Sequence, residues 1–250
     1  MAKEPEKLVV KVSESDSVTA LLYLAAKQNR AGMTLILGHG AGANQLSSFM
    51  RLFASGFAER GFDAMTFNFV YMEQGRRVPD PKAKLEGCYH AVNEAAKRHK
   101  KLQGNRLVIG GKSMGGRIAS QVAAASNDQA LPDSRASAMS ASAGIAGLVF
   151  LGYPLHPPGK PEQLRDAHLK DIRAPMLFVQ GSRDVFGTEA ELRAVIKRLH
   201  LPATLHAIEG GDHSLKVPRS AAITQQQVYE STMDDVARWL ETQVRKPEGR

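Results

Sequence analysis

Short apolar runs alternate with segments of helical periodicity along most of this 250-residue chain. The runs have the length of buried strands, and the segments between them repeat their apolar residues every three or four positions. This alternation predicts an α/β fold with a mostly parallel, twisted sheet and helices on both of its faces. We expect strands at 7–12, 17–26, 33–37, 64–70, 106–109, 145–151, 175–180 and 203–208, and helices at 44–60, 81–100, 114–126, 189–199 and 225–245.

The pattern also predicts how the sheet begins, how many domains the chain forms and how large a lid it can carry. Polar residues separate the first two predicted strands, so we expect them to add an antiparallel N-terminal edge to the parallel sheet. The chain shows no linker and no internal repeat, which predicts a single domain over residues 1–250. The short stretch between Leu151 and Pro175 leaves room only for a minimal lid. A run of small residues at 136–147 fits either a loop or a helix.

Composition and charge limit the classes of partner that we expect for the chain. The net charge is +8, but Lys and Arg are scattered, and the densest run, 97–101, falls at the end of a predicted helix, where cations complement the helix dipole. We therefore expect no nucleic-acid partner. No apolar stretch is long enough to span a membrane, the first residues are charged, and the single cysteine, Cys88, cannot form an internal disulfide. These features predict a cytoplasmic protein without a membrane partner, either a monomer or a homo-dimer.

A glycine-rich segment at 110–116 lies between a predicted strand and a predicted helix. It contains the pattern G-x-S-x-G as Gly111, Ser113 and Gly115. In this context the pattern is typical of a sharp strand-to-helix turn that projects the serine oxygen, with small residues on both sides because the two arms of the turn nearly touch. The N-terminus of the following helix would help to stabilise negative charge at the reacting centre. We therefore predict Ser113 as a nucleophile.

Two nucleotide-binding interpretations compete with this one. A phosphate-binding P-loop would need a glycine seven positions before Ser113, where the chain has Arg106, so this interpretation fails. A dinucleotide site is suggested by Gly38, Gly40 and Ala43, which match the permissive G-x-G-x-x-G/A spacing after a strand. Its acidic partner should end the next strand, whereas Asp63 precedes that strand. A nucleotide-binding oxidoreductase therefore remains a weaker alternative.

The loop at 38–42 has a second interpretation beside a nucleophilic serine. Acyl transfer needs two backbone N–H donors aimed at the developing oxyanion. We predict that these are the N–H groups of Met114, directly after the nucleophile, and of Ala41 in the glycine-rich loop. Ligands of α/β sheets bind at the carboxyl ends of the strands. We accordingly assign substrate contacts to polar residues that follow strands, namely His39, Tyr71 and His156. For His156 the alternative is that its Pro-rich loop only packs over the pocket.

An acid and a base follow in the appropriate order. Asp184 comes just after the predicted strand 175–180, and His213 lies in the loop between the last strand and the last helix. The order Ser…Asp…His is that of α/β hydrolases. We predict that His213 takes the proton of Ser113 and that Asp184 orients the imidazole. The alternatives for the acid are Asp212, Asp166 and Asp171.

These motifs resemble those of the α/β-hydrolase superfamily over about residues 7–245. Segments 38–42, 111–117 and above all 151–161 (LGYPLHPPGKP), with Asn68, Phe69 and Tyr71, are similar to a branch related to dienelactone hydrolases. That branch includes testis-expressed protein thirty and the hydrolase-like domain of the NSL complex regulatory subunit. The resemblance implies a hydrolase scaffold with Ser113, Asp184 and His213 at the triad positions, and it implies no particular substrate.

The sequence thus predicts a serine hydrolase that cleaves a carboxylic ester, thioester or related acyl substrate through an acyl-enzyme. Such a mechanism needs neither a metal nor a cofactor, so we expect none. A catalytically silent binding or scaffold protein on a hydrolase fold is the alternative. If Lys112, Arg117, Arg76 and Arg77 converge near the serine, an anionic ester or thioester becomes a plausible substrate.

Overall fold

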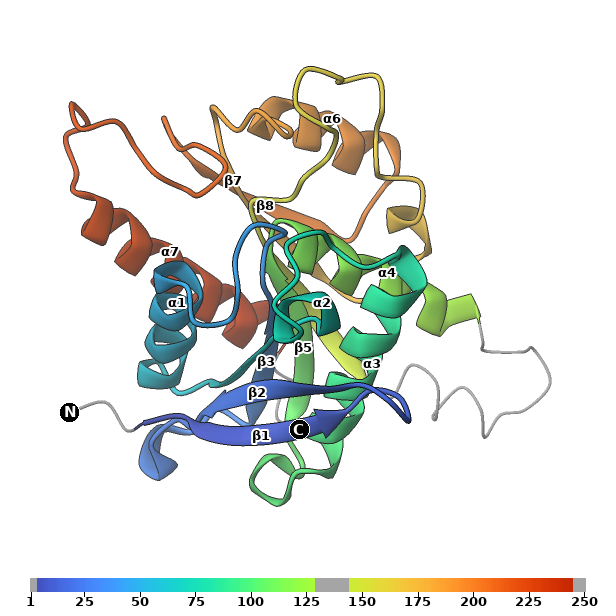
Figure 1. The fold of residues 1–250 in the computed structure, drawn as a ribbon. Helices are drawn as coiled ribbons and strands as arrows, with labels where there is room; N and C mark the ends of the chain where they lie inside the picture. Colours follow the sequence, from blue (N-terminus) through green and yellow to red (C-terminus); the bar gives the residue numbers. More distant parts are fainter. Residues whose placement is uncertain (1–3, 129–143, 245–250) are drawn as a thin grey trace.

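A computed structural model describes residues 4–128 and 144–244, and its centre is one twisted sheet of eight strands (Figure 1). The strand order is β1-β2-β4-β3-β5-β6-β7-β8. The pairs β1–β2 and β2–β4 are antiparallel, and every other neighbouring pair is parallel. The predicted parallel sheet with an antiparallel N-terminal edge is therefore confirmed. The strands are β1 (Glu6–Lys11), β2 (Ser17–Tyr23), β3 (Met33–Gly38), β4 (Asp63–Phe67), β5 (Arg106–Lys112), β6 (Ile145–Leu151), β7 (Met176–Gly181) and β8 (Ala203–Ile208).

Helices cover both faces of the sheet (Figure 1). One face carries α1 and α7, which also contact each other, and the other carries α3, α4 and α6. No helix within the described ranges is long and apolar enough to cross a membrane. The helices are α1 (Ser48–Glu59), α2 (Val70–Glu73), α3 (Lys82–Arg98), α4 (Met114–Asp128), α6 (Glu189–Arg198) and α7 (Gln225–Trp239), with a π-helical turn at Leu240–Val244 and short 3-10 helices at Lys27–Asn29, Lys100–Leu102 and Leu169–Asp171.

The strands fill two hydrophobic cores because successive side chains point to opposite faces of a sheet. Leu35 and Leu37 of β3 pack with the α1 and α7 side, whereas Ile36 between them packs with the α3 and α4 side. All three are almost fully buried. This double burial explains why the central strands appear in the sequence as continuous apolar runs.

Two loops at the carboxyl ends of the last strands are bounded by well-capped helices. The loop after β7 leads into α6, where Thr188 and Glu191 form a reciprocal capping box. The loop after β8 leads into α7, where Thr224 and Gln227 do the same. Such caps satisfy backbone N–H groups that a helix leaves unpaired, so they fix where each loop ends.

The structure departs from the predicted elements in a few places. The helix predicted at 44–60 begins only at Ser48, because the Ser47 hydroxyl caps it and the Gln45 N–H donates to the Asn68 side chain instead. β4 ends at Phe67, and the short helix α2, which was not predicted, follows it. The small-residue run at 136–147 lies outside the described residues up to 143, and residues 145–147 begin β6.

Candidate active site

Ser113 lies at the sharp turn between β5 and α4. Its φ of 51° is in the left-handed region, which a residue with a side chain rarely adopts. Two hydrogen bonds hold the turn, from the Ser113 N–H to the Leu151 carbonyl (3.2 Å) and from the Arg117 N–H to the Ser113 carbonyl (3.1 Å). A strained residue that the surrounding structure holds in place is frequent at functional sites.

The glycines on both sides of Ser113 are required by a neighbouring strand. A Cβ atom on Gly111 or on Gly115 would lie 2.1 Å from the carbonyl oxygen of Gly38, at the end of β3. From the sequence, these glycines were expected because the two arms of the turn nearly touch. The closest obstacle in the structure is instead the Gly38 backbone, against which both arms pack. β3 therefore determines which residues this turn accepts.

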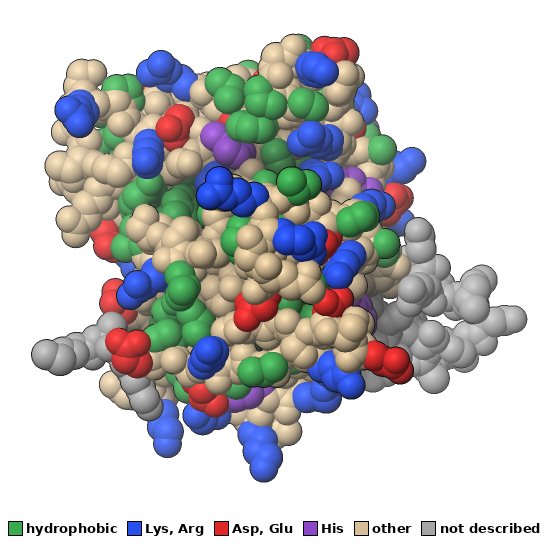
Figure 2. Space-filling model, viewed as in Figure 1, with side chains coloured by type: hydrophobic (Ala, Val, Ile, Leu, Met, Phe, Trp, Pro, Cys, Tyr) green, Lys and Arg blue, Asp and Glu red, His purple; other side chains and the backbone are tan. Residues whose placement is uncertain are grey.

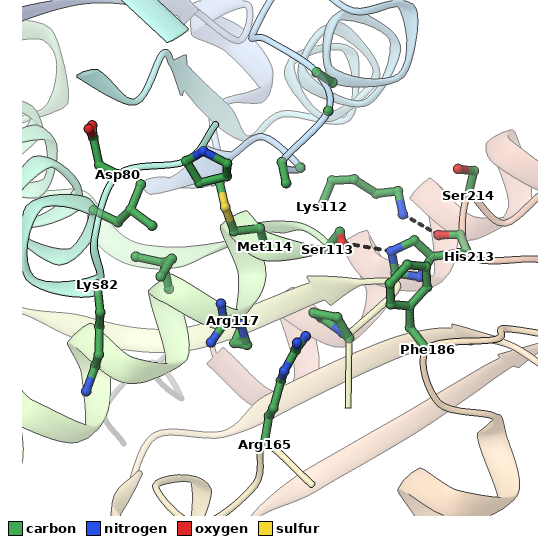
Figure 3. A pocket seen from close by; sticks show the side chains of 18 residues that line it. Asp80, Lys82, Lys112, Ser113, Met114, Arg117, Arg165, Phe186, His213 and Ser214 are labelled. Atoms are coloured by element: carbon green, nitrogen blue, oxygen red, sulfur yellow. Dashed lines mark hydrogen bonds between the residues drawn. The ribbon is translucent and has the colours of Figure 1, made fainter. Parts of the chain in front are cut away.

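Ser113, His213 and Asp184 form a continuous chain of hydrogen bonds, of which Figure 3 shows the bond between Ser113 and His213. The Ser113 Oγ lies 2.7 Å from His213 Nε2, and His213 Nδ1 lies 2.7 Å from Asp184 Oδ2. The three residues come from the ends of β5, β8 and β7, which the parallel sheet places at the same edge. The fold thus brings together the three residues that the sequence assigned as nucleophile, base and acid.

Asp184 is held on both carboxylate oxygens. Its side chain is fully buried, Oδ2 also accepts from Gln180 Nε2 (2.7 Å), and Oδ1 accepts from the Phe186 N–H (2.8 Å). These hydrogen bonds fix the orientation of the carboxylate toward the His213 ring. Gln180 was missed in the sequence, although it is a polar residue at the end of the otherwise apolar strand β7.

Two of the alternative acids, Asp212 and Asp166, are engaged by other partners. Asp212 Oδ1 accepts from the N–H groups of Ser214 (2.7 Å) and Lys216 (2.9 Å), so this side chain closes its own loop. Asp166 forms an ion pair with Arg198. Asp184 is accordingly the carboxylate that faces the imidazole.

Two further side chains hold His213. The Phe186 ring lies against the imidazole, with 4.2 Å between ring centroids. Lys112 Nζ donates a hydrogen bond to the His213 carbonyl, and burial lowers the pKa of Lys112 to about 8. The loop that carries His213 is thereby tied to β5, which carries Ser113. Phe186 gave no signal in the sequence, since it belongs to an irregular loop.

A cavity of about 530 Å³ opens beside Ser113 and His213. A second cavity, of about 270 Å³, lies on the other side of Lys112, and apolar side chains including Phe49, Met50 and Leu52 line part of it. Figure 3 shows the side chains of the larger cavity. Its lining residues are Gly40, Ala41, Gly42, Ala43, Pro79, Asp80, Lys82, Leu85, Lys112, Ser113, Met114, Arg117, Ile118, Pro154, Arg165, Phe186, His213 and Ser214.

Both backbone groups predicted to stabilise an oxyanion line this cavity. Met114 is the first residue of α4, and Ala41 lies in the loop after β3. Within residues 4–128 and 144–244, neither N–H group donates to a protein acceptor. Two unpaired donors beside a hydrogen-bonded serine can stabilise the negative oxygen of a tetrahedral intermediate.

A family model described as alpha/beta hydrolase domain matches residues 31–241. The match covers most of the sheet, the turn at Ser113, and the loops that carry Asp184 and His213. The chain belongs to the α/β-hydrolase family.

Solved structures of α/β hydrolases share this fold at low sequence identity. An alpha-beta serine hydrolase homologue from Coxiella burnetii superposes with a TM-score of 0.70 at 16% identity, covering 96% of this chain and 99% of that chain. Dienelactone hydrolase from Anabaena variabilis gives 0.68 at 17% identity, with 97% and 100% covered. Est1E from Butyrivibrio proteoclasticus, solved with ferulic acid bound, gives 0.72 at 15% identity, with 96% and 100% covered.

Two of the predicted substrate contacts in this α/β hydrolase instead support the loop of Ala41. His39 is fully buried, and its Nε2 accepts from the Phe69 N–H (3.1 Å) while Nδ1 donates to the Gly40 carbonyl (2.8 Å). Tyr71 is also buried and donates to the Ala41 carbonyl (3.0 Å). Neither lines the cavity, and the substrate contact assigned to each stays a prediction. Both side chains turn toward the backbone because polar groups inside a core need partners.

His156, the third residue assigned to substrate contact, also lies outside the lining of the cavity. It is buried, its Nδ1 donates to the Pro157 carbonyl (2.8 Å), and its Nε2 lies 3.3 Å from the Glu191 carboxylate of α6. The loop between β6 and β7 reaches the cavity through Pro154 and Arg165 instead. His156 thus joins this loop to α6.

The dinucleotide interpretation does not fit the hydrolase either. The loop at 38–43 does not begin a helix, because α1 starts only at Ser48. Asp63 lies at the opposite end of β4, where it accepts from the Ala25 N–H (2.9 Å) and pairs with Arg30 (3.0 Å). The described part of the chain also contains no group of three or more His, Cys, Asp or Glu residues arranged to hold a metal ion.

Buried His39 makes the stability of the fold sensitive to acid. Burial lowers the pKa of His39 from 6.5 to about 4, so the unfolded chain binds a proton more readily between these values. The stabilisation that neutral His39 gives to the folded state is therefore complete above pH 6.5, and it is lost as the pH falls toward 4. We expect His39 to contribute a loss of about 3 kcal/mol to the free energy of unfolding over this window.

Urea denaturation at several pH values measures this loss. The variant His39→Gln should flatten the decline relative to the wild type, whereas His90→Gln, at an exposed position of α3, should leave it unchanged. An equal decline in the wild type and in His39→Gln would contradict the role given to His39.

Proposed function

We propose that the protein is a serine hydrolase that cleaves carboxylic esters or thioesters through an acyl-enzyme. The observation that carries the proposal is the continuous hydrogen-bond chain Ser113–His213–Asp184 at the wall of a cavity. The unpaired N–H groups of Ala41 and Met114 beside it support the same chemistry.

Acylation begins when the Ser113 Oγ attacks the carbonyl carbon of the substrate. His213 Nε2, 2.7 Å away, accepts the serine proton as the new C–O bond forms. Asp184 accepts the hydrogen bond from Nδ1–H, so it holds the imidazole with Nε2 free to accept and stabilises the imidazolium that results. The hydrogen bonds from Gln180 and Phe186 keep the Asp184 carboxylate in this orientation.

The tetrahedral intermediate places negative charge on the former carbonyl oxygen. The N–H groups of Ala41 and Met114 stabilise this oxyanion, and the N-terminus of α4 adds a favourable dipole. The C–O or C–S bond to the leaving group then breaks, and His213 returns the proton to the leaving atom. Water, deprotonated by His213, attacks the acyl-enzyme and releases the acid together with free Ser113.

The comparisons support acyl chemistry only in general terms. The similar structures include a serine hydrolase homologue, a dienelactone hydrolase and Est1E with ferulic acid bound. Dienelactone hydrolases tend to use cysteine as nucleophile, whereas this chain has Ser113, so we do not extend their reaction to it. The resemblance of segment 151–161 to the narrower branch of testis-expressed protein thirty stays a prediction.

A fluorophosphonate probe tests the proposal directly, because such probes phosphonylate an activated serine. We expect stoichiometric labelling of the folded protein, located at Ser113 by mass spectrometry, and no labelling of Ser113→Ala or of heat-denatured wild type. Circular dichroism and the unfolding temperature serve as controls for folding. Failure of the well-folded wild type to react would reject the hydrolase and favour a binding or scaffold protein.

A further inference from the structure

The larger cavity beside Ser113 is strongly cationic. Four of its lining residues are Lys or Arg, and Asp80 is the one acidic residue among them. Asp80 Oδ1 already accepts from Arg76 Nη2 (2.6 Å), so this carboxylate is neutralised from outside the cavity. Figure 2 shows Lys and Arg side chains gathered around a histidine on the upper half of this face of the molecule. The four cations are Lys82, Lys112, Arg117 and Arg165.

Two of these cations already have partners in the protein. Lys112 Nζ donates to the His213 carbonyl, as described above. Lys82 Nζ lies 3.5 Å from the carboxylate of Glu86, one turn further along α3, and its side chain is mostly exposed. Neither therefore requires a ligand to satisfy its charge.

Arg117 and Arg165 differ from both lysines. Within the described residues, neither side chain forms an ion pair or a hydrogen bond, and the buried Nε of Arg117 has no acceptor. Figure 3 shows the Arg117 and Arg165 side chains among those that line the cavity. Burial and the neighbouring Arg117 charge lower the pKa of Arg165. Two partly buried cations without a counterion repel each other, and an anion between them would relieve the repulsion.

The backbone holds both arginines in place. Arg117 lies in the first turn of α4, where its N–H donates to the Ser113 carbonyl (3.1 Å). The Arg165 N–H donates to the Leu155 carbonyl (2.8 Å), and the Arg165 carbonyl accepts from the buried Tyr153 hydroxyl (3.1 Å). The backbone of each arginine is therefore fixed relative to the serine, so a ligand would have to order only the side chains.

We propose that Arg117 and Arg165 bind an anionic group of the substrate, a carboxylate or a phosphate, so that this hydrolase acts on negatively charged acyl compounds. The inference rests on the proposed function. Guanidinium groups match both anions through paired, charge-assisted hydrogen bonds. The smaller cavity, with its apolar side chains, suits the uncharged part of such a substrate.

Two of the cations that the sequence suggested near the serine, Arg76 and Arg77, do not belong to this site. Arg76 and Arg77 do not line the cavity, and Arg76 is engaged by Asp80 and by Gln74. Arg165 lines the cavity together with Arg117 instead. It was not among the cations expected near the serine from the sequence. The residues that carry the anionic specificity are thus one from the helix after the nucleophile and one from the loop after β6.

Equilibrium binding to Ser113→Ala tests the inference without requiring turnover. Titration calorimetry at constant ionic strength would compare monomethyl adipate and methyl 5-phosphonopentanoate with their uncharged counterparts, dimethyl adipate and the fully methylated phosphonate. We expect at least one of the two anions to bind more tightly than its neutral counterpart, by about tenfold or more. The anion with the larger preference identifies the group as carboxylate or phosphate.

Second substitutions locate the effect. Adding Arg117→Met or Arg165→Met should weaken binding of the preferred anion about 10- to 100-fold and bring its affinity close to that of the neutral ester. The matched control is Arg77→Met, which removes an exposed cation outside the cavity and should preserve the preference. Equal affinity for charged and neutral esters, or a preference that survives both arginine substitutions, would overturn the inference.

The anion site and the catalytic serine are tested by separate experiments, so either can fail without the other. Fluorophosphonate labelling tests the serine, whereas these titrations test the arginines in a protein that lacks the serine. Labelling at Ser113 without an anionic preference would leave the hydrolase intact and reject the anion site. An anionic preference without labelling would retain the anion site and reject the hydrolase.

Discussion

Replacing Ser113 or His213 by alanine is expected to lower kcat for a short-chain ester by about 10⁴- to 10⁶-fold. Ser113 supplies the nucleophile, and His213, 2.7 Å from it, is the only base in hydrogen-bond contact with its oxygen among the described residues. Because the two act as a unit, the double variant should be no slower than the worse single variant. Steady-state kinetics with a chromogenic acetate ester measures all three.

Asp184 and Asp212 provide a matched test and control for the hydrogen-bonded unit of Ser113, His213 and the acid. Asp184→Asn removes the acceptor that fixes the His213 tautomer and should lower kcat about 10⁴-fold. Asp212→Asn keeps the oxygen that closes its own loop and should leave kcat close to that of the wild type. Comparable losses in both variants, or additive losses for Ser113→Ala and His213→Ala, would contradict the arrangement proposed here.

Replacing Gly115 by alanine is expected to lower the free energy of unfolding by about 3 kcal/mol. The new Cβ would lie 2.1 Å from the Gly38 carbonyl oxygen, so β3 and the turn must separate. Gly111→Ala should be worse, because its φ of +138° adds backbone strain to the same close contact. Urea denaturation monitored by circular dichroism measures both changes.

Gly87 in α3 is the control for this second prediction. No atom lies within 4 Å of a Cβ built there, and the position is inside a regular helix. Gly87→Ala should therefore raise the free energy of unfolding by about 0.5–1 kcal/mol through helix propensity. If Gly115→Ala proved as stable as Gly87→Ala, the turn would not be packed against β3 as described.

The sequence indicated the residues of the site better than it indicated their surroundings. Ser113, Asp184 and His213 each follow a strand, and parallel strands bring such positions to one edge. Asp212 was an alternative for the acid in the sequence, and the structure shows it turned into its own loop. In contrast, His39 follows a strand but faces the core, because its direction depends on the buried Phe69 N–H that it binds.

Short stretches of this sequence by themselves determined the alternation of strands and helices, the antiparallel edge and the turn at Ser113. These features depend on periodicity and on local sterics, which a window of a few residues contains. Only the tertiary structure decided that Gly38 imposes the glycines of the turn and that Arg165, rather than Arg76 or Arg77, joins Arg117 in the cavity. Such contacts join residues far apart in the chain through irregular loops, and the path of those loops is set by the packing of the whole molecule.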